Sequence, residues 1–185
     1  MSLTLSEVLS LLQHRGQNQY GMEAINQLEH ALQCADLAEK AGETPETVVA
    51  SLLHDLGHLL AAERDGLQEH NTEHDDLHQY IALPFIRQLF PDAVLEPIRM
   101  HVDAKRYLCL IDPGYWADLS PASKQSLEQQ GGVFTEAEAE VFISQPFAAE
   151  AVRLRRYDDL AKVSGKLVPD LAYYHTHLQQ VALTA

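Results

Sequence analysis

The sequence has few basic residues for its length. Of its 185 residues, 13 are lysine or arginine and 27 are aspartate or glutamate, so the formal net charge is -14. A surface with this balance repels the phosphates of nucleic acids and of anionic lipids, and no run rich in lysine and arginine offsets it locally. We therefore expect neither a nucleic acid nor a membrane as a partner.

Cysteines are also scarce, and long apolar runs are missing. Cys34 and Cys109 form no C-x-x-C motif and lie in apolar segments, so we interpret both as core thiols without a redox role. No apolar stretch is long enough to cross a bilayer, and the sequence does not start with a basic segment followed by an apolar one. The sequence therefore predicts a cytoplasmic protein.

The pattern that is present is helical. Hydrophobic residues make up 46% of the chain, which is enough for one core, and we expect a single domain over residues 1–185. Apolar residues recur at steps of three and four, typical of helices, and loops are expected at 107–119 and 129–132. Helices are predicted at 24–40, 44–60, 75–89, 93–102, from 121, from 136, at 147–157 and at 169–181. No segment alternates like a strand, so the predicted fold class is all-α.

Histidines and carboxylates fall on the apolar faces of several of these helices. In SLLHDLGH, residues 51–58, His54 and Asp55 interrupt an apolar run, and a charge among leucines needs a partner to offset its desolvation. Helical bundles build metal centres from such side chains on several helices. The candidate ligands are His30, His54, Asp55, His78, His101 and Asp158.

The spacing of these residues limits how they can share a metal ion. Neighbours on a helix point about 100° apart, so His54 and Asp55 are poorly placed to bind one ion as equivalent ligands, but the two oxygens of Asp55 could bridge two ions. His74 competes with His78 for the third histidine position. We prefer His78 because an apolar helical face follows it, whereas His74 lies in an acidic stretch. His58 is interpreted as structural, with a role beside the centre left open.

The order H…HD…H…H…D resembles the HD-domain superfamily, and more narrowly its mixed-valence di-iron phosphonate oxygenases, the 2-amino-1-hydroxyethylphosphonate dioxygenase family. The resemblance implies an all-helical HD-domain bundle. It spans residues 20–158, although the segment 61–76 departs from the family pattern. The stretches that carry it are YGMEAINQLEHALQCA, SLLHDLGH, HVDAKRYL, LSPASKQSLEQQGG and RLRRYD.

The resemblance also implies the cofactors. It implies a mixed-valence Fe(II)/Fe(III) pair, with dioxygen as co-substrate. One iron would be held by His30, His54, Asp55 and Asp158, and the other by Asp55, His78 and His101.

Further residues match the substrate site of the family. Lys105 lies four residues after His101, one turn further if the helix continues, and a serine pair near a helix N-terminus suits an anion. By resemblance, Tyr20 and Glu23 form a gate, with Tyr20 at an iron position until substrate arrives and Glu23 meeting the substrate amine. The residues expected to bind the phosphonate are Lys105, Ser123, Ser126, Gln130 and Arg155.

The resemblance therefore implies an oxygenase that cleaves a carbon–phosphorus bond. The expected substrate is a small organophosphonate, a 1-hydroxy-2-(amino or trimethylammonio)ethylphosphonate, and the products are phosphate and glycine or glycine betaine. Glu23 favours the primary amine. The alternative is a metal-dependent HD-domain phosphohydrolase acting on a nucleotide or another phosphate ester. A non-catalytic HD-type interaction domain and the inositol-opening oxygenase branch are further alternatives, and the oligomeric state stays undetermined.

Overall fold

The structure, a computed structural model, describes residues 2–65 and 77–183. Within these residues the regular elements are helices, so the predicted all-α fold class is confirmed. The helices are α1 (Leu5–Arg15), α2 (Gln27–Lys40), α3 (Pro45–Leu53), α4 (Leu56–Asp65), α5 (His78–Ile81), α6 (Leu83–Ile86), α7 (Asp92–Ile111), α8 (Tyr115–Asp118), α9 (Pro121–Gln129), α10 (Glu136–Ile143), α11 (Ala148–Leu160) and α12 (Leu171–Val181).

Local sequence signals explain where several helices begin. Thr44 caps α3 and Ser120 caps α9, each by accepting a hydrogen bond from a backbone N–H in the first turn, and proline follows each cap. Thr135 and Glu138 form the expected capping box at the start of α10. Thr4 and Glu7 form another at α1, a helix that the sequence analysis did not identify.

The predicted helix 44–60 is wrong as one continuous element. It breaks at His54 and Asp55, between α3 and α4. The His54 ring contacts the Ser51 carbonyl oxygen at 2.9 Å, where a continuing helix would place a backbone donor. His54 keeps helical backbone angles (φ -57°, ψ -34°), yet His54 and Asp55 are both buried and their side chains approach to 3.3 Å, so the two face the same interior space.

Two other boundaries differ from the prediction. The described part of the helix expected at 75–89 consists of two short helices, α5 and α6, because Pro84 in the first turn of α6 lacks the N–H that would continue the ladder. The helix expected at 93–102 continues to Ile111, so part of the loop expected at 107–119 is helical, and α8 occupies another part of it.

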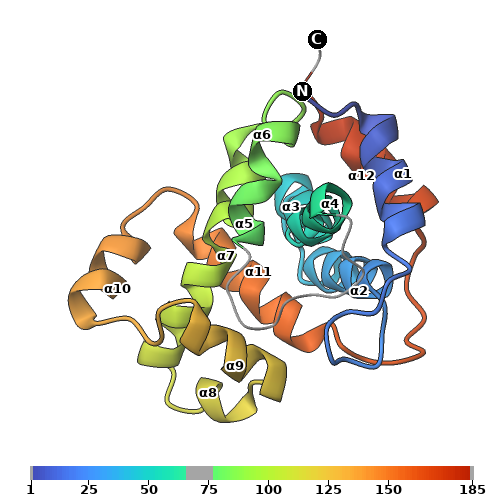
Figure 1. Cartoon of the computed structure of the whole chain (residues 1–185). Helices are drawn as coiled ribbons and strands as arrows, with labels where there is room; N and C mark the ends of the chain where they lie inside the picture. The colour runs from blue at the N-terminus through green and yellow to red at the C-terminus, as the bar shows by residue number, and fades with distance from the viewer. Residues whose placement is uncertain (1, 66–76, 184–185) are drawn as a thin grey trace.

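Four helices form the centre of the bundle. The long helix α7 packs along α11, and α2 packs along α3, with further contacts between these pairs (Figure 1). Fully buried apolar residues fill the space between them, among them Leu53, Ile98 and Leu154. In the same view α8, α9 and α10 lie to one side of this centre. In the described part of the chain, no helix combines the length and the apolarity that crossing a membrane requires.

Both ends of the described chain are attached to the segment around α6. The N–H of Leu3 donates to the carbonyl oxygen of Phe85 at 2.8 Å, and the N–H of Leu183 donates to that of Leu89 at 2.8 Å. Accordingly, residues 2 and 183, the two ends of the described chain, lie near the top of Figure 1, next to α6. The segment that they hold follows directly after His78.

Candidate metal centre and anion site

One group of candidate ligands lies where α2, the α3–α4 break and α11 meet. The Nε2 atoms of His30 and His54 are 3.3 Å apart. Asp55 Oδ2 lies 3.7 Å from the first of these nitrogens and 3.3 Å from the second. Asp158 Oδ1 lies 3.4 Å from His30 Nε2. The structure therefore brings together the four side chains expected at one iron.

A second group lies on the other side of Asp55. His78, the first residue of α5, and His101, on α7, place their Nε2 atoms 3.0 Å apart. Asp55 Oδ1 lies 3.3 Å from His78 Nε2 and 3.7 Å from His101 Nε2. Each oxygen of Asp55 thus faces its own pair of histidines, which is the arrangement expected of a bridging carboxylate. His74, the competitor of His78, lies outside the described residues.

The hydrogen bonds of the histidine rings test whether metal fits here. The Nδ1 atoms of His30, His54 and His101 contact the carbonyl oxygens of Ala161, Ser51 and Ile98 at 2.9, 2.9 and 2.7 Å. A carbonyl oxygen can only accept, so each Nδ1 carries its hydrogen, and each ring in its neutral form directs a lone pair from Nε2 inward. Lone pairs that face each other inside a protein need a cation between them. The donor set therefore fits divalent metal, and backbone carbonyls fix the rings as they do at metal sites.

Charge at the centre supports the same conclusion. Burial opposes protonation of His54, but the carboxylate of Asp55, aided by Asp158, raises its pKa to about 9. Burial likewise opposes ionisation of Asp55, yet the neighbouring histidines hold its pKa well below the ordinary value. The site thus favours a positive charge between these residues, and a metal ion can take the place of the proton.

Cys34 and His58 also adjoin the donor groups. Cys34 Sγ lies 3.6 Å from His30 Nε2, and burial together with the carboxylates of Asp158 and Asp55 raises the pKa of the thiol well above its ordinary value. Its Sγ and the ring nitrogens of His30 and His54 also form a buried group of donors close enough together to hold a metal ion. The ring of His58 stacks on that of His78 with centroids 4.0 Å apart, and its Nε2 lies 3.9 Å from Asp55 Oδ1. His58 is beside the centre, which is the role that the sequence left open.

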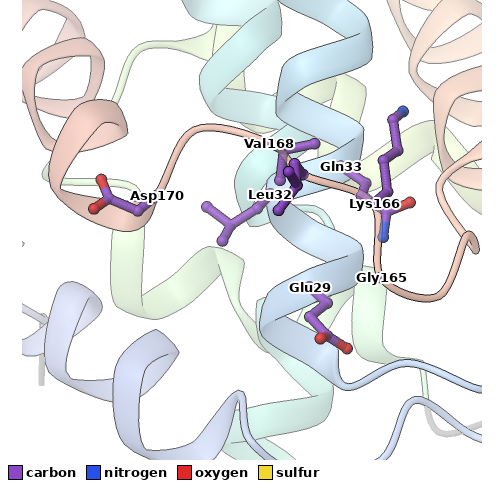
Figure 2. Close-up of a pocket in the computed structure, with 8 residues that line it drawn as sticks. Glu29, Leu32, Gln33, Gly165, Lys166, Val168 and Asp170 are labelled. Carbon is purple, nitrogen blue, oxygen red and sulfur yellow. The ribbon is translucent and has the colours of Figure 1, made fainter.

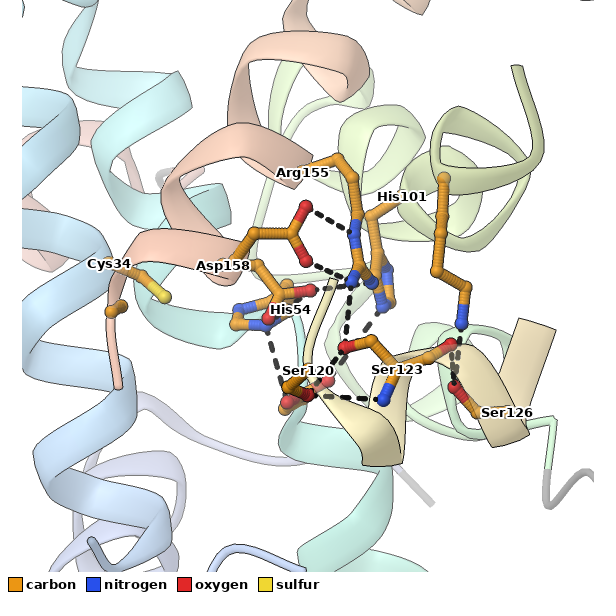
Figure 3. A network of polar contacts seen from close by, with 12 residues as sticks. Cys34, His54, His101, Ser120, Ser123, Ser126, Arg155 and Asp158 are labelled. Carbon is orange, nitrogen blue, oxygen red and sulfur yellow. Dashed lines mark hydrogen bonds and ion pairs between the residues drawn. The ribbon is translucent and has the colours of Figure 1, made fainter. Parts of the chain in front are cut away.

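Beside the metal groups, α7, α9 and α11 bring cationic and hydroxyl groups together (Figure 3). Lys105 is 1% exposed and donates to Ser126 Oγ at 2.7 Å. Burial and the nearby guanidinium of Arg155 lower the pKa of Lys105 to about 7. Arg155 in turn donates to Ser123 Oγ at 3.4 Å. This cluster, which we call the cradle (Lys105, Ser123, Ser126 and Arg155), suits an anion with several oxygens.

Arg155 is held in place by further polar groups on both sides. One terminal nitrogen lies 2.8 Å from Asp158 Oδ2, and the other contacts Asp159. Its Nε donates to the hydroxyl of Tyr115 at 3.2 Å, and that hydroxyl in turn donates to Asp159. Burial opposes the charge, but Asp158 and Asp159 hold the pKa of Arg155 well above its ordinary value. The guanidinium is therefore a fixed cation that joins the cradle to the metal groups.

The remaining predicted residues lie around this arrangement. Tyr20 stacks on His30 with centroids 3.9 Å apart, and its hydroxyl donates to Asp158 Oδ1 at 3.4 Å, against the first metal group. Glu23 faces Lys162, with 3.7 Å between Glu23 Oε1 and the lysine Nζ. Gln130 caps the far end of α9, where its N–H donates to the Ser126 carbonyl oxygen at 3.0 Å.

Lys162, Tyr115 and Asp159 are the contacts of this site that the sequence analysis missed. Lys162 donates to Ser123 Oγ at 3.1 Å, so it belongs to the same polar network as the cradle. No sequence pattern marked it, because it is a single lysine in the connection after α11. Tyr115 lies on a short helix inside the stretch expected to be a loop, where no periodic pattern marked it.

A separate pocket opens on the outer side of α2 (Figure 2). Its volume is about 200 Å³. It lies between α2 and the connection that precedes α12, and the residues predicted to bind metal or phosphonate do not line it. The residues that line it are Glu29, Leu32, Gln33, Gly165, Lys166, Leu167, Val168 and Asp170.

The helical bundle and the paired donor groups define a metal-binding protein of a known class. The sequence pattern of the HD domain matches residues 28–130, a range that contains the four candidate histidines and Asp55 but ends before Asp158. The chain belongs to the HD-domain family.

Two relatives narrow this class. The chain is 46% identical to the hydroxymethylphosphonate dioxygenase of Gimesia maris over 175 residues, which cover 95% of this chain and 86% of that protein. It is 34% identical to the [1-hydroxy-2-(trimethylamino)ethyl]phosphonate dioxygenase (glycine-betaine-forming) of Leisingera caerulea over 165 residues, 89% of this chain and 82% of that protein. The expected likeness to HD-domain phosphonate dioxygenases is confirmed.

Proposed function

We propose that this protein is a di-iron oxygenase that uses dioxygen to cleave the carbon–phosphorus bond of a small 1-hydroxyphosphonate. The observation that carries the proposal is the pair of donor groups joined by the two oxygens of Asp55, with a cationic cradle beside them. Both relatives are named as dioxygenases of hydroxyphosphonates, and their overall similarity to this chain supports the same reaction class.

In this proposal the metals are two irons in the mixed-valence Fe(II)/Fe(III) state. His30, His54, Asp55 and Asp158 would hold one, and Asp55, His78 and His101 the other. When bound, the irons supply the redox chemistry that allows dioxygen to react with the substrate, because protein side chains alone cannot do so. The protein's own contribution is to fix the ligands before the metal arrives and to exclude water around them.

The cradle would bind and orient the phosphonate. Lys105 and Arg155 balance its negative charge, while the hydroxyls of Ser123 and Ser126 direct its oxygens. Gln130, at the end of α9, would complete this contact. Tyr20, which lies against His30 and Asp158, would move aside for substrate, as the gate role requires.

The net reaction balances without any other reactant. A 1-hydroxyphosphonate dianion and dioxygen give a carboxylate, inorganic phosphate and one proton. The carbon that carries the hydroxyl is oxidised, the carbon–phosphorus bond breaks, and both atoms of dioxygen end in the products. With a 2-amino substituent the carboxylate is glycine, and with a trimethylammonio substituent it is glycine betaine.

The test is phosphate release by iron-loaded protein with and without oxygen. We expect release from a 1-hydroxyphosphonate in air, oxygen consumption in proportion to it, and loss of both under anaerobic conditions. A phosphate monoester with manganese or magnesium in place of iron is the control for hydrolysis. Phosphate release at an undiminished rate without oxygen would exclude the oxygenase and favour the phosphohydrolase.

A further inference from the structure

Lys162 connects two parts of the candidate site. It lies two residues after α11, and its Nζ donates to Ser123 Oγ in the cradle at 3.1 Å. The same Nζ lies 3.7 Å from Glu23 Oε1 and 5.9 Å from the centre of the Tyr20 ring. Its side chain is 12% exposed. One ammonium group therefore adjoins the predicted phosphonate site and the acid on the segment before α2.

Glu23 is the acid that a cationic substituent of a substrate would approach. Its Oε1 is buried and accepts no hydrogen bond, although Lys162 supplies a positive charge nearby. The carboxylate is thus already neutralised by a residue of the chain. A second cation at this place would have to displace Lys162 or bear its repulsion in a poorly hydrated space.

The substrates named for the two relatives differ in this respect. Hydroxymethylphosphonate carries no cation, whereas the trimethylamino compound carries a permanent one on the carbon next to the reacting carbon. Arg155 and Lys162 both donate to Ser123 Oγ, so a phosphonate bound beside this hydroxyl also lies near Lys162, which attracts its negative charge. The arm that bears a cation extends from the same small molecule, so it cannot lie far from that lysine.

We propose that Lys162, paired with Glu23, selects hydroxyphosphonates without a cationic substituent and disfavours those with an amino or trimethylammonio group. The inference rests on the proposed function and names its substrate class, of which hydroxymethylphosphonate is the smallest member. Its cleavage by dioxygen gives formate, inorganic phosphate and one proton, which balances atoms and charge. The amine expected to meet Glu23 is, in this view, replaced by the lysine ammonium.

The experiment compares three substrates and four proteins. The substrates are hydroxymethylphosphonate, 2-amino-1-hydroxyethylphosphonate and its trimethylammonio form, and the readout is kcat/KM for oxygen-dependent phosphate release. The proteins are the wild type, Lys162→Met, Lys162→Arg and Lys166→Met. Lys166 is the matched control, because it lies on the same connection as Lys162 but faces Asp36 of α2 and not the cradle. Its Nζ lies 3.7 Å from Asp36 Oδ2, and Lys40 also pairs with that aspartate.

We expect the wild type to prefer hydroxymethylphosphonate. Methionine at position 162 should reduce this preference roughly tenfold, mainly through KM, because it removes one charge and is only one atom shorter than lysine. Arginine at 162 and methionine at 166 should keep the preference. A wild type that prefers a cationic substrate, or a folded Lys162→Met protein with an unchanged ratio, overturns the inference.

A binding measurement separates this inference from the proposed function. Methylphosphonate and 2-aminoethylphosphonate lack the 1-hydroxyl, and their affinities for the iron-loaded protein can be measured calorimetrically without oxygen. We expect tighter binding of methylphosphonate, and nearly equal binding after Lys162→Met. If no hydroxyphosphonate is turned over, the proposed function fails, and equal affinities in the wild type overturn the selectivity independently.

Discussion

Replacing Gly57 by alanine should remove the second metal group while leaving the first. Gly57 lies in α4, two residues after Asp55, and packs against the backbone at the start of α5. A Cβ at this position would stand 2.0 Å from the carbonyl oxygen of His78, 2.7 Å from its carbonyl carbon and 2.9 Å from its Cα. All three are backbone atoms, so no side-chain rotation relieves the overlap.

The size of the effect follows from these distances. Ordinary contact of a Cβ begins at 3.4 Å, so the His78 backbone must retreat by about 1.4 Å, the difference between that value and 2.0 Å. Metal–ligand distances deviate from their ordinary values by only about 0.2 Å. After such a shift, His78 can no longer share an ion with His101 and Asp55. Overpacking of this kind costs about 1–3 kcal/mol of folding stability, or roughly 2–4 °C in Tm for each kcal/mol.

Iron content and thermal unfolding test this prediction together. We expect about two irons per chain in the wild type and about one in Gly57→Ala, with turnover lost. Gly114→Ala is the control, because its added Cβ would meet nothing closer than 3.8 Å and its φ of -86° suits alanine. A Gly57→Ala protein with two irons, normal turnover and an unchanged Tm would refute the reasoning.

Three further predictions concern the metals and the cradle. Asp55→Ala should bind neither iron firmly, because both groups lose their shared carboxylate, and retained activity would contradict the bridging role. In the wild type, kcat/KM should fall as pH rises through about 7, since Lys105 loses the charge that attracts the phosphonate. Lys105→Arg should lack this alkaline decline in a pH–rate profile. Removing metal with a chelator should lower Tm by about 5–10 °C, because metal binds the folded state alone; an unchanged Tm would argue against a resident metal.

Much of the fold followed from local signals in the sequence. The pairs Thr44 with Pro45 and Ser120 with Pro121 each specify a cap and a first helical turn, and α3 and α9 begin where they predict. The break at His54 was not predictable from periodicity, because apolar residues recur at helical steps on both sides of it, as Leu52, Leu56 and Leu59 do. The ring contact of His54 with the Ser51 carbonyl oxygen does not by itself end a helix, since His101 makes the same contact with Ile98 inside the continuous α7.

The sequence predicted which residues are the candidate metal ligands, but it did not predict how they are arranged or which other residues adjoin them. His30, His54 and His101 stood out because polar groups on apolar faces require an explanation. Lys162 did not stand out, since a single lysine in a connection has no pattern, and only the folded chain places it between Glu23 and Ser123. Which oxygen of Asp55 faces which histidine pair likewise depends on how four helices and a short turn pack together.

The attachment of both chain ends to the segment around α6 affects how the protein can be handled. Leu3 and Leu183 are hydrogen-bonded to Phe85 and Leu89, seven and eleven residues beyond His78. A purification tag or a fused partner at either terminus would therefore be joined to the segment around α6, which follows the helix that carries His78. Metal content measured on a tagged preparation should accordingly be compared with that of the same protein after the tag has been removed.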